Sequence, residues 1–484
     1  MIAADLNFDY TLFIPEFLLG GLVVLLVALD LYVPQVKKSW LSYVAAAGLL
    51  AVAGVSLAWI GTESDFAGIV SVDDYTTFFR VFFMAMAAVI CLLSGKLIEE
   101  KFSHPGEYFA LLVLSTIGAI GMAASRELMT AYLSLELLSF SLYILVSYQK
   151  FDAKSNEAGL KYLLLGAFAS AMFLYGMSLI YGIAGSTYYS EIASGLQNPA
   201  GDFQWAMLMG LVLIVTGLGF KVAAVPFHMW TPDAYEGAFV PVTAYLATTS
   251  KAAGFALLLR LFSGSFQVVH DDWSWMIAGI AAATMILGNL VALQQHNIKR
   301  LMAYSSIGQV GYMLMGIAGL SHDTASALLF HMTGYMVSNM AVFVVIIAWF
   351  NLTGKDEIGD FRGMRERAPL LAAVLAGALF SLAGLPLFAG FPTKFILFQA
   401  VVDEGYLWLA TIAVVTSVIS LYYYLQIMRQ AFVEKPAEGE EERLPVPLLM
   451  NGMAAAMMIG VLYVGLYPQQ LFDAVDKATK ALAL

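Results

Sequence analysis

Cysteine and charge are both scarce in this chain of 484 residues. Its one cysteine, Cys91, cannot by itself form an intrachain disulfide, a four-cysteine zinc site or an iron–sulfur cluster. Only 12% of the residues are charged and 60% are hydrophobic, whereas an ordinary soluble domain carries about 25% charge. A soluble fold of this length could not cover its surface with so few charges, so a soluble protein is excluded. The formal net charge of −11 argues against nucleic acid as a partner.

Long apolar runs occupy most of the sequence. A helix needs about 20 mostly apolar residues to cross the hydrocarbon layer of a membrane. Fourteen stretches meet this requirement, and the loops between them are too short or too apolar to form a soluble domain. We therefore predict an all-α polytopic membrane protein in which residues 1–484 form a single membrane domain. The predicted spans centre near Leu22, Ala51, Ala85, Ile117, Ser139, Ala171, Ile214, Leu257, Ala282, Met313, Met340, Leu382, Val415 and Met458.

Lysine and arginine in the loops predict the orientation in the membrane. Fifteen basic residues fall in one set of alternate loops, and three (Arg126, Lys477 and Lys480) fall in the other set and the C-terminal tail. We expect the first set to face the cytoplasm of a cell with an inner (plasma) membrane, which puts both termini on the non-cytoplasmic side. The fifteen residues are Lys37, Lys38, Lys96, Lys101, Lys150, Lys154, Lys299, Arg300, Lys355, Arg362, Arg365, Arg367, Arg429, Lys435 and Arg443.

A few charged residues lie inside the apolar runs instead of in loops. A charge at the centre of a span costs roughly 2.5–3.5 kcal/mol on insertion scales, and such residues usually face the bundle interior along an ion or proton path. Arg80 and Arg260 are different, because each lies near the outer end of its span, where a long side chain can reach the interface at little cost. The charged residues within the runs are Lys161, Lys221, Lys251, Lys394 and Glu136.

Two interpretations of these five residues are open. Lys161 lies only about a turn into its span, so its ammonium group could reach the cytoplasmic interface. The other four lie deeper, and a structural interpretation makes them buried ion pairs that only fix the packing of helices. The functional interpretation is that a Glu–Lys pair switches between two protonation states, which proton translocation requires and static packing does not. We favour the functional interpretation.

Proline predicts that two spans are broken. Pro226 follows Lys221 closely, and Pro386 and Pro392 precede Lys394. Proline removes a helix hydrogen bond, and the freed carbonyl groups at membrane depth must face protein or water. The two broken spans are the seventh and the twelfth, so they run in opposite directions. This favours an inverted repeat, with spans 4–8 at 107–263 and spans 9–13 at 272–433.

Three further polar residues are candidates for supporting roles. His331, near the start of the eleventh span, could relay protons or simply hydrogen-bond a neighbour, because imidazole titrates near pH 6.5. His228 lies near the cytoplasmic end of the seventh span and is a candidate for proton access. Asp233 is expected to be the N-cap of a short helix that follows it.

Several motifs resemble one known family. The segments GFKVAAVPFHMWTPDAYEGA at 219–238, SKAAGFA at 250–256, NIKRLMAYSSIGQVGY at 297–312 and KYLLLGAFAS at 161–170 are similar to those of subunit N of proton-pumping NADH–quinone oxidoreductase, respiratory complex I. The resemblance extends over essentially the whole chain, including the number of spans. The sibling subunits M and L and the cation/proton antiporter subunits share a Glu–Lys–Lys pattern but usually lack the TPDAYEG form.

The resemblance implies a role for each buried charge. Glu136 and Lys221 match the glutamate and lysine that pair in the first half-channel of the family, and Lys251 matches its central connecting lysine. Lys394 matches the terminal proton carrier on the second broken helix, and Lys161 matches a lysine that modulates the pair. His331 lies close to a polar position of the family's central axis.

The resemblance also implies a setting for the chain. It implies a proton-translocating, non-redox subunit of an NADH:quinone oxidoreductase, with no cofactor or metal of its own. FMN, iron–sulfur clusters and quinone would then belong to other subunits. The expected partners are lipids, the antiporter-like subunit M, the small subunits K and J, and a lateral helix of subunit L. The alternative is a cation/proton antiporter subunit that exchanges sodium for protons through the same lysines.

Overall fold

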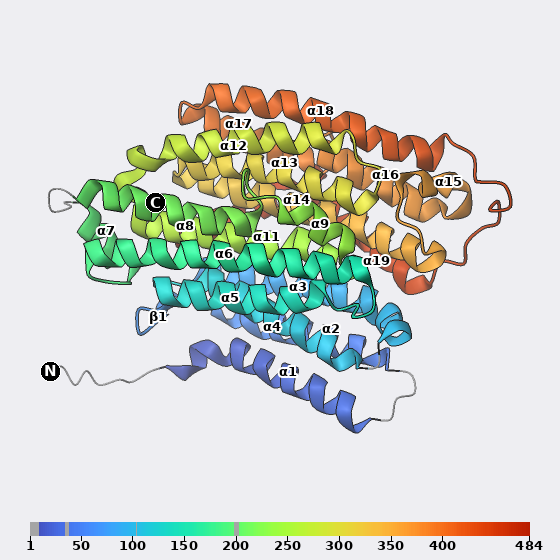
Figure 1. Cartoon of the computed structure of the whole chain (residues 1–484), viewed down its shortest axis with the longest axis horizontal. Helices are drawn as coiled ribbons and strands as arrows, with labels where there is room; N and C mark the ends of the chain where they lie inside the picture. The colour runs from blue at the N-terminus through green and yellow to red at the C-terminus, as the bar shows by residue number, and fades with distance from the viewer. Residues whose placement is uncertain (1–8, 34–37, 103, 198–202) are drawn as a thin grey trace.

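Long helices lie side by side in the computed structural model, which describes residues 9–33, 38–102, 104–197 and 203–484 (Figure 1). In this view the chain advances from α1 at one edge of the bundle to α18 at the opposite edge. Lys37, one of the basic loop residues, lies outside the described residues. All fourteen predicted span centres fall within helices. The prediction of an all-α membrane protein is confirmed.

A short β-hairpin lies between the second and third spans of the first half. The elements as far as the half-helix after the first break are η1 (Tyr10–Phe13), α1 (Ile14–Tyr32), α2 (Trp40–Ser56), η2 (Leu57–Trp59), β1 (Ser64–Phe66), β2 (Val70–Val72), α3 (Asp74–Lys101), α4 (Pro105–Ala124), α5 (Leu128–Val146), α6 (Ala153–Ala184), α7 (Tyr189–Gln197), α8 (Gln204–Val222) and α9 (Trp230–Gly237). β1 and β2 pair antiparallel, with Asp65 opposite Ser71.

The eighth span is built from several pieces, and the later spans follow it. These elements are α10 (Val240–Tyr245), η4 (Leu246–Ser250), α11 (Lys251–Leu261), η5 (Phe262–Phe266), η6 (Gln267–Val269), α12 (His270–Ala292), α13 (Ile298–Gly319), α14 (His322–Thr353), η7 (Ile358–Phe361), α15 (Met364–Arg367), α16 (Pro369–Ala383), α17 (Gly390–Asp403), α18 (Leu407–Phe432), α19 (Leu448–Leu466) and α20 (Pro468–Thr479).

Within the described ranges, eleven helical segments are long and apolar enough to cross a membrane. One of them, 240–292, contains two of the predicted spans, the eighth and the ninth. The tenth span is α13, and the twelfth is divided between α16 and α17. The helices are therefore compatible with fourteen passes, two of which are interrupted.

Corresponding helices pack in corresponding pairs in the two predicted repeats. α4 packs on α5 and on α11, and α12 packs in the same way on α13 and on α18. α6 lies along both halves of the first broken span, α8 and α9, as α14 lies along α16 and α17. This arrangement is that of an inverted repeat of five helices. The boundaries 107–263 and 272–433 stay a prediction.

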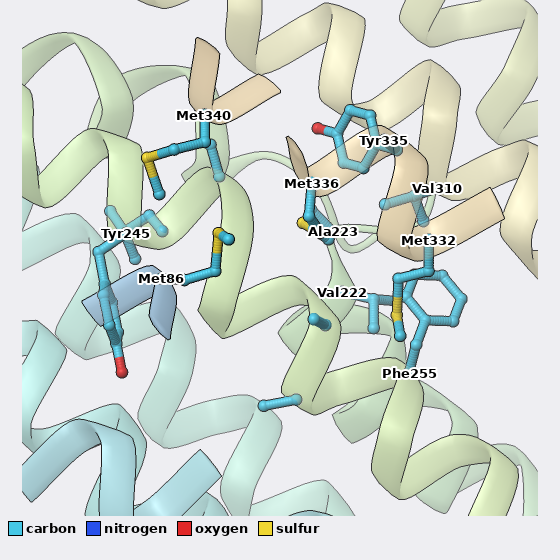
Figure 2. Packing of buried hydrophobic residues seen from close by; sticks show 14 of the residues in the cluster. Met86, Val222, Ala223, Tyr245, Phe255, Val310, Met332, Tyr335, Met336 and Met340 are labelled. Atoms are coloured by element: carbon cyan, nitrogen blue, oxygen red, sulfur yellow. The ribbon is translucent and has the colours of Figure 1, made fainter. Parts of the chain in front are cut away.

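α14 is buried over nearly its whole length, as expected for a helix that is apolar all round. Figure 2 shows Met332 of α14 with Val222 of α8 and Phe255 of α11 in the apolar core at the bundle centre. The end of α8 and the central span therefore meet α14 in the apolar core.

Arg80 and Arg260 do not extend to the surface as expected from their places near the span ends, because each is buried in an ion pair. Arg80 is fully buried and its guanidinium binds both carboxylate oxygens of Glu16, at 2.8 and 2.9 Å. Arg260 is 6% exposed and binds both carboxylate oxygens of Asp73, at 2.7 and 2.9 Å. The sequence shows where these arginines lie along a span, but it does not show the acidic partner on another helix.

Candidate functional site

Side chains satisfy the backbone groups that the first break leaves free. α8 ends shortly after Phe220, whose carbonyl oxygen accepts a hydrogen bond of 2.9 Å from the indole nitrogen of Trp230 in α9. In the connecting loop, the backbone amide of Val225 donates to the hydroxyl of Thr284 in α12, at 3.0 Å. Pro226, the next residue, has no amide to satisfy. A non-helical segment at this depth is tolerable because its polar groups are paired within the protein.

Lys221 lies in the last turn of α8, immediately before this break. Its side chain is 2% exposed, and its ammonium group donates to the hydroxyl of Ser139 in α5 at 3.0 Å. Glu136 lies one turn before Ser139 on α5, and its carboxylate accepts a hydrogen bond from the hydroxyl of Ser170 in α6. Lys221 and Glu136 therefore face one site, although among the described residues no carboxylate lies within 4.0 Å of the lysine. A small cavity of about 10 Å³ beside Lys221, lined also by Ser139 and Ser170, is close to the space of one water molecule.

Lys251 begins α11, directly after a π-helical turn, η4 (Leu246–Ser250). It is 1% exposed, its ammonium group donates to the hydroxyl of Ser306 in α13 at 2.7 Å, and it lies 5.8 Å from the ring centroid of Tyr235 in α9. The irregular turn also leaves the carbonyl of Ala247 free, and Asn339 of α14 donates to it at 3.1 Å. Such π-turns occur frequently at functional sites.

The second break separates α16 from α17. α16 ends at Gly384, whose φ of +89° is a left-handed conformation that favours glycine. Gly390 starts α17 so close to α16 that a Cβ there would overlap the carbonyl oxygen of Ser381. The Ser381 hydroxyl accepts a hydrogen bond from the Gly390 amide at 2.9 Å, which fixes the two half-helices to each other.

Lys394 lies in the first turns of α17 and points back into this break. It is 5% exposed, and its ammonium group donates to the freed carbonyl of Leu382 at 2.8 Å and to the hydroxyl of Ser417 in α18 at 3.0 Å. It also lies 5.1 Å from the ring centroid of Tyr312 in α13. Lysine here replaces the helix hydrogen bond that the break removes.

The two histidines differ in their surroundings. His331 of α14 is 1% exposed, and its Nδ1 lies 3.2 Å from the hydroxyl of Thr393, which directly precedes Lys394. Its Nε2 is buried without a partner among the described residues. His228 lies in the first break and is partly buried, and its Nδ1 likewise has no partner in the described chain. His331 is thus part of the surroundings of Lys394, and His228 belongs to the first break.

Lys161 is separate from the buried lysines. Its side chain is 45% exposed, and its ammonium group lies 2.7 Å from Glu157 and 2.8 Å from Asp233. Arg300 of α13 binds Asp233 and Glu236 of α9, each at 2.9 Å. This network ties the short half-helix α9 to α6 and to α13. Lys161 therefore contributes to a charged surface at the end of the bundle.

Asp233 is not a helix N-cap, contrary to the sequence prediction. It lies inside α9, whose cap position is Met229, and its carboxylate is used by Lys161 and Arg300. The local pattern before the helix favoured capping, but ion pairs with two distant helices decide its role.

Hydroxyl and amide side chains that the sequence interpretation did not single out complete the site. They contact a buried lysine, Glu136 or the backbone carbonyl that Lys394 binds, and each lies in an apolar run, where composition alone does not distinguish a serine or glutamine. Spacing could have identified Ser139, which lies three residues after Glu136 on the same helix face. The other missed residues are Ser170, Tyr235, Ser306, Gln309, Tyr312 and Ser417.

Comparison with known proteins assigns the chain to a family. Residues 125–420 match the family model of the transmembrane NADH:quinone oxidoreductase/Mrp antiporter region. The NADH-quinone oxidoreductase subunit N of Moorella thermoacetica is 41% identical over 456 residues, which cover 94% of this chain and 95% of that protein.

Two solved structures have the same fold. A chain of respiratory complex I from Thermus thermophilus is 30% identical, with a TM-score of 0.80 and coverage of 96% of this chain and 100% of that chain. A chain of the Mrp complex from Dietzia is 21% identical, with a TM-score of 0.85 and coverage of 98% and 97%, and it shows the fold alone. This chain belongs to the subunit N family of the NADH-quinone oxidoreductases, the antiporter-like membrane subunits of complex I.

Proposed function

We propose that this chain conducts protons across the membrane through Glu136, Lys221, Lys251 and Lys394 while quinone is reduced elsewhere in the complex. The observation that supports the proposal is how the three lysines are buried and hydrogen-bonded. Each is at most 5% exposed, each is hydrogen-bonded to a hydroxyl group, and in the described ranges none has a carboxylate within 4.0 Å.

A lysine in this setting is suited to gaining and losing a proton. A fixed buried ion pair would stabilise the ammonium form permanently, because breaking such a pair costs about 3–5 kcal/mol. A hydroxyl partner stabilises less, and it can accept from an ammonium group or donate to a neutral amine. Small changes nearby can therefore shift the lysine between its two forms.

Glu136 supplies the change in the first half. Its carboxylate accepts a hydrogen bond from Ser170 and does not contact Lys221. The ammonium group of Lys221 donates instead to Ser139, which lies on α5 with Glu136. A movement of the carboxylate toward Lys221 would favour the ammonium form, and a movement away would release the proton. The proton then passes to Lys251 at the centre and to Lys394 in the second half, with His331 beside it.

The two ends of the bundle suggest where protons enter and leave. The loops rich in lysine and arginine favour a cytoplasmic location for the end that contains α9, with His228 and Lys161 near the entry. The opposite end carries both the start of α1 and α20, whose Lys477 binds Asp74 at 3.1 Å. Both termini then lie outside the cytoplasm of a bacterial inner membrane.

The complex would supply what this chain does not contain. We propose that its neighbours are the antiporter-like subunit M, the small subunits K and J, and the lateral helix of subunit L. FMN, iron–sulfur clusters and the quinone site are proposed to lie in other subunits. Cys91, the only cysteine, is fully buried in α3 among apolar side chains.

Replacement of Lys221 tests the proposal. In the assembled complex in proteoliposomes, Lys221→Ala should reduce proton pumping, and it should lower quinone reduction in parallel if the two are tightly coupled. Lys435→Ala, on an exposed loop, is the matched control and should pump normally. A fully assembled Lys221→Ala complex that pumps at the normal rate would overturn the proposal. The same assay without sodium separates proton pumping from sodium/proton exchange.

A further inference from the structure

Gln309 of α13 lies between the central lysine and the second broken helix. Ser306, one turn earlier on the same helix, accepts the hydrogen bond from Lys251 at 2.7 Å. The Gln309 amide nitrogen donates to the carbonyl of Leu382 at 3.3 Å, and Lys394 donates to the same carbonyl at 2.8 Å. Residues three apart on a helix lie about 5–6 Å from each other on one face. One face of α13 therefore contacts Lys251 through Ser306 and the partner of Lys394 through Gln309.

The oxygen of the Gln309 amide is the second observation. The residue is 2% exposed, and this oxygen is buried without a hydrogen-bond partner in the described part of the chain. A buried acceptor without a partner is unfavourable, and buried polar atoms of this kind usually bind another polar group or an ordered water molecule. His331 Nε2 and Ser250 Oγ, beside Lys394 and Lys251 respectively, are further buried polar atoms that have no partner among the described residues.

We propose that Gln309 is a positioning residue for proton transfer between Lys251 and Lys394, and that its amide oxygen holds the water molecule through which the proton passes. This proposal rests on the function proposed above. The protons balance: the ammonium of Lys251 releases one proton to a chain of hydrogen-bonded water, of which the molecule at Gln309 is one member, and the chain releases one proton to the neutral amine of Lys394. Gln309 itself keeps its protonation state throughout.

The choice of an amide has a physical reason. A neutral side chain avoids the cost of a third charge between two lysines, and it offers a donor and an acceptor at the same time. The amide nitrogen of Gln309 donates to the Leu382 carbonyl, and this carbonyl is free to accept because α16 ends there. The break in the twelfth span thus orients the side chain that would orient the water.

The variant Gln309→Leu tests the proposal, since it keeps the approximate volume and removes both hydrogen-bonding groups. We expect pumping per quinone reduced to fall by about tenfold, less than the 100-fold or more that loss of a proton-transferring group can cause. Gln309→Glu retains an acceptor oxygen at the same place, so it should restore pumping in part and introduce a new pH dependence. Gln430→Leu is the matched control, because the amide oxygen of Gln430 also has no partner in the described ranges but lies near the C-terminal end of α18.

The outcomes separate this inference from the function on which it rests. Loss of pumping in Gln309→Leu, with partial recovery in Gln309→Glu and none lost in Gln430→Leu, supports it. Normal pumping in an assembled Gln309→Leu complex overturns it, and so does equal loss in both Gln309 variants with an unchanged pH profile. A Lys394→Ala complex measured beside them reports on the proposed function: normal pumping there would reject the proton path itself.

Discussion

The buried ion pair between Asp73 and Arg260 allows a quantitative prediction. Arg260 makes four hydrogen bonds, two to Asp73 and one each to the Thr76 hydroxyl and the Ala123 carbonyl. Asp73→Asn keeps the shape but removes the negative charge, which leaves a buried guanidinium without a counter-ion. Breaking such a pair destabilises a protein by about 3–5 kcal/mol. Asp73→Ala should cost about 1 kcal/mol more, because Asp73 is also the N-cap of α3 and accepts from the Thr76 amide at 2.8 Å.

Resistance to heating is the appropriate measurement for a membrane complex. The assay determines the temperature at which half of this subunit has left the purified complex, and both single variants should lower it. Asp65→Asn is the matched control on the same end of the bundle, since its pair with Arg126 is 3.5 Å long and half-exposed and should contribute less than about 1 kcal/mol. The double variant Asp73→Leu with Arg260→Met should recover much of the loss, because an apolar pair of similar volume is often neutral.

Two results would refute this reasoning. An Asp73→Asn complex as resistant as the wild type would mean that the unpaired guanidinium costs nothing. A double variant as sensitive as Asp73→Asn would mean that packing, and not charge, is responsible.

The same pair predicts a dependence on pH. Burial acts to raise the pKa of Asp73, but the Arg260 guanidinium and the hydrogen bonds from Ser71 and Thr76 outweigh it and hold that pKa well below its usual value. The pair therefore stabilises fully above the unfolded pKa of about 4, and this contribution is lost as the pH falls below that value. Asp73→Asn should remove this acid-dependent part of the stability.

Two further substitutions test other parts of the structure. Gly390→Ala would press a Cβ against the Ser381 carbonyl and should cost about 1–3 kcal/mol and reduce pumping, whereas Gly279→Ala, with no atom within 4 Å, should change neither. Lys161→Met should destabilise the subunit by less than about 1 kcal/mol and should hardly change its dissociation temperature, because the side chain is 45% exposed. A clear fall in that temperature would show that the ion pairs on α9 are stronger than surface ion pairs generally are.

The apolar runs and prolines were sufficient to predict the spans and both breaks. A span is dictated by local composition, because about 20 apolar residues suffice to cross the membrane, and a proline beyond the first turn of a helix removes one of its hydrogen bonds. The low charge content made Lys221, Lys251 and Lys394 visible, and all three are buried as expected.

The partners of these residues could not be predicted, because they come from other helices. Ser306 is 55 residues from Lys251, and Asp73 is 187 residues from Arg260. Nothing local distinguishes a serine that accepts from a lysine from one that bonds its own backbone. Lys161 illustrates the same limit, since its position in the span allowed an interior location, and only its pairing with Asp233 of α9 reveals a surface one.

The π-helical turn η4 sets how the first part of the eighth span is rotated relative to α11, because the turn takes up one extra residue. Such a turn contains one residue more than an α-helical path between the same two points. If the same residues of η4 adopted α-helical geometry instead, the preceding part of the span would be rotated by about 100° relative to α11. The serine partner of Lys251 and the anchoring of α10 could then no longer be satisfied together. The direction in which the central lysine faces is therefore encoded by how many residues precede it as well as by which residues they are.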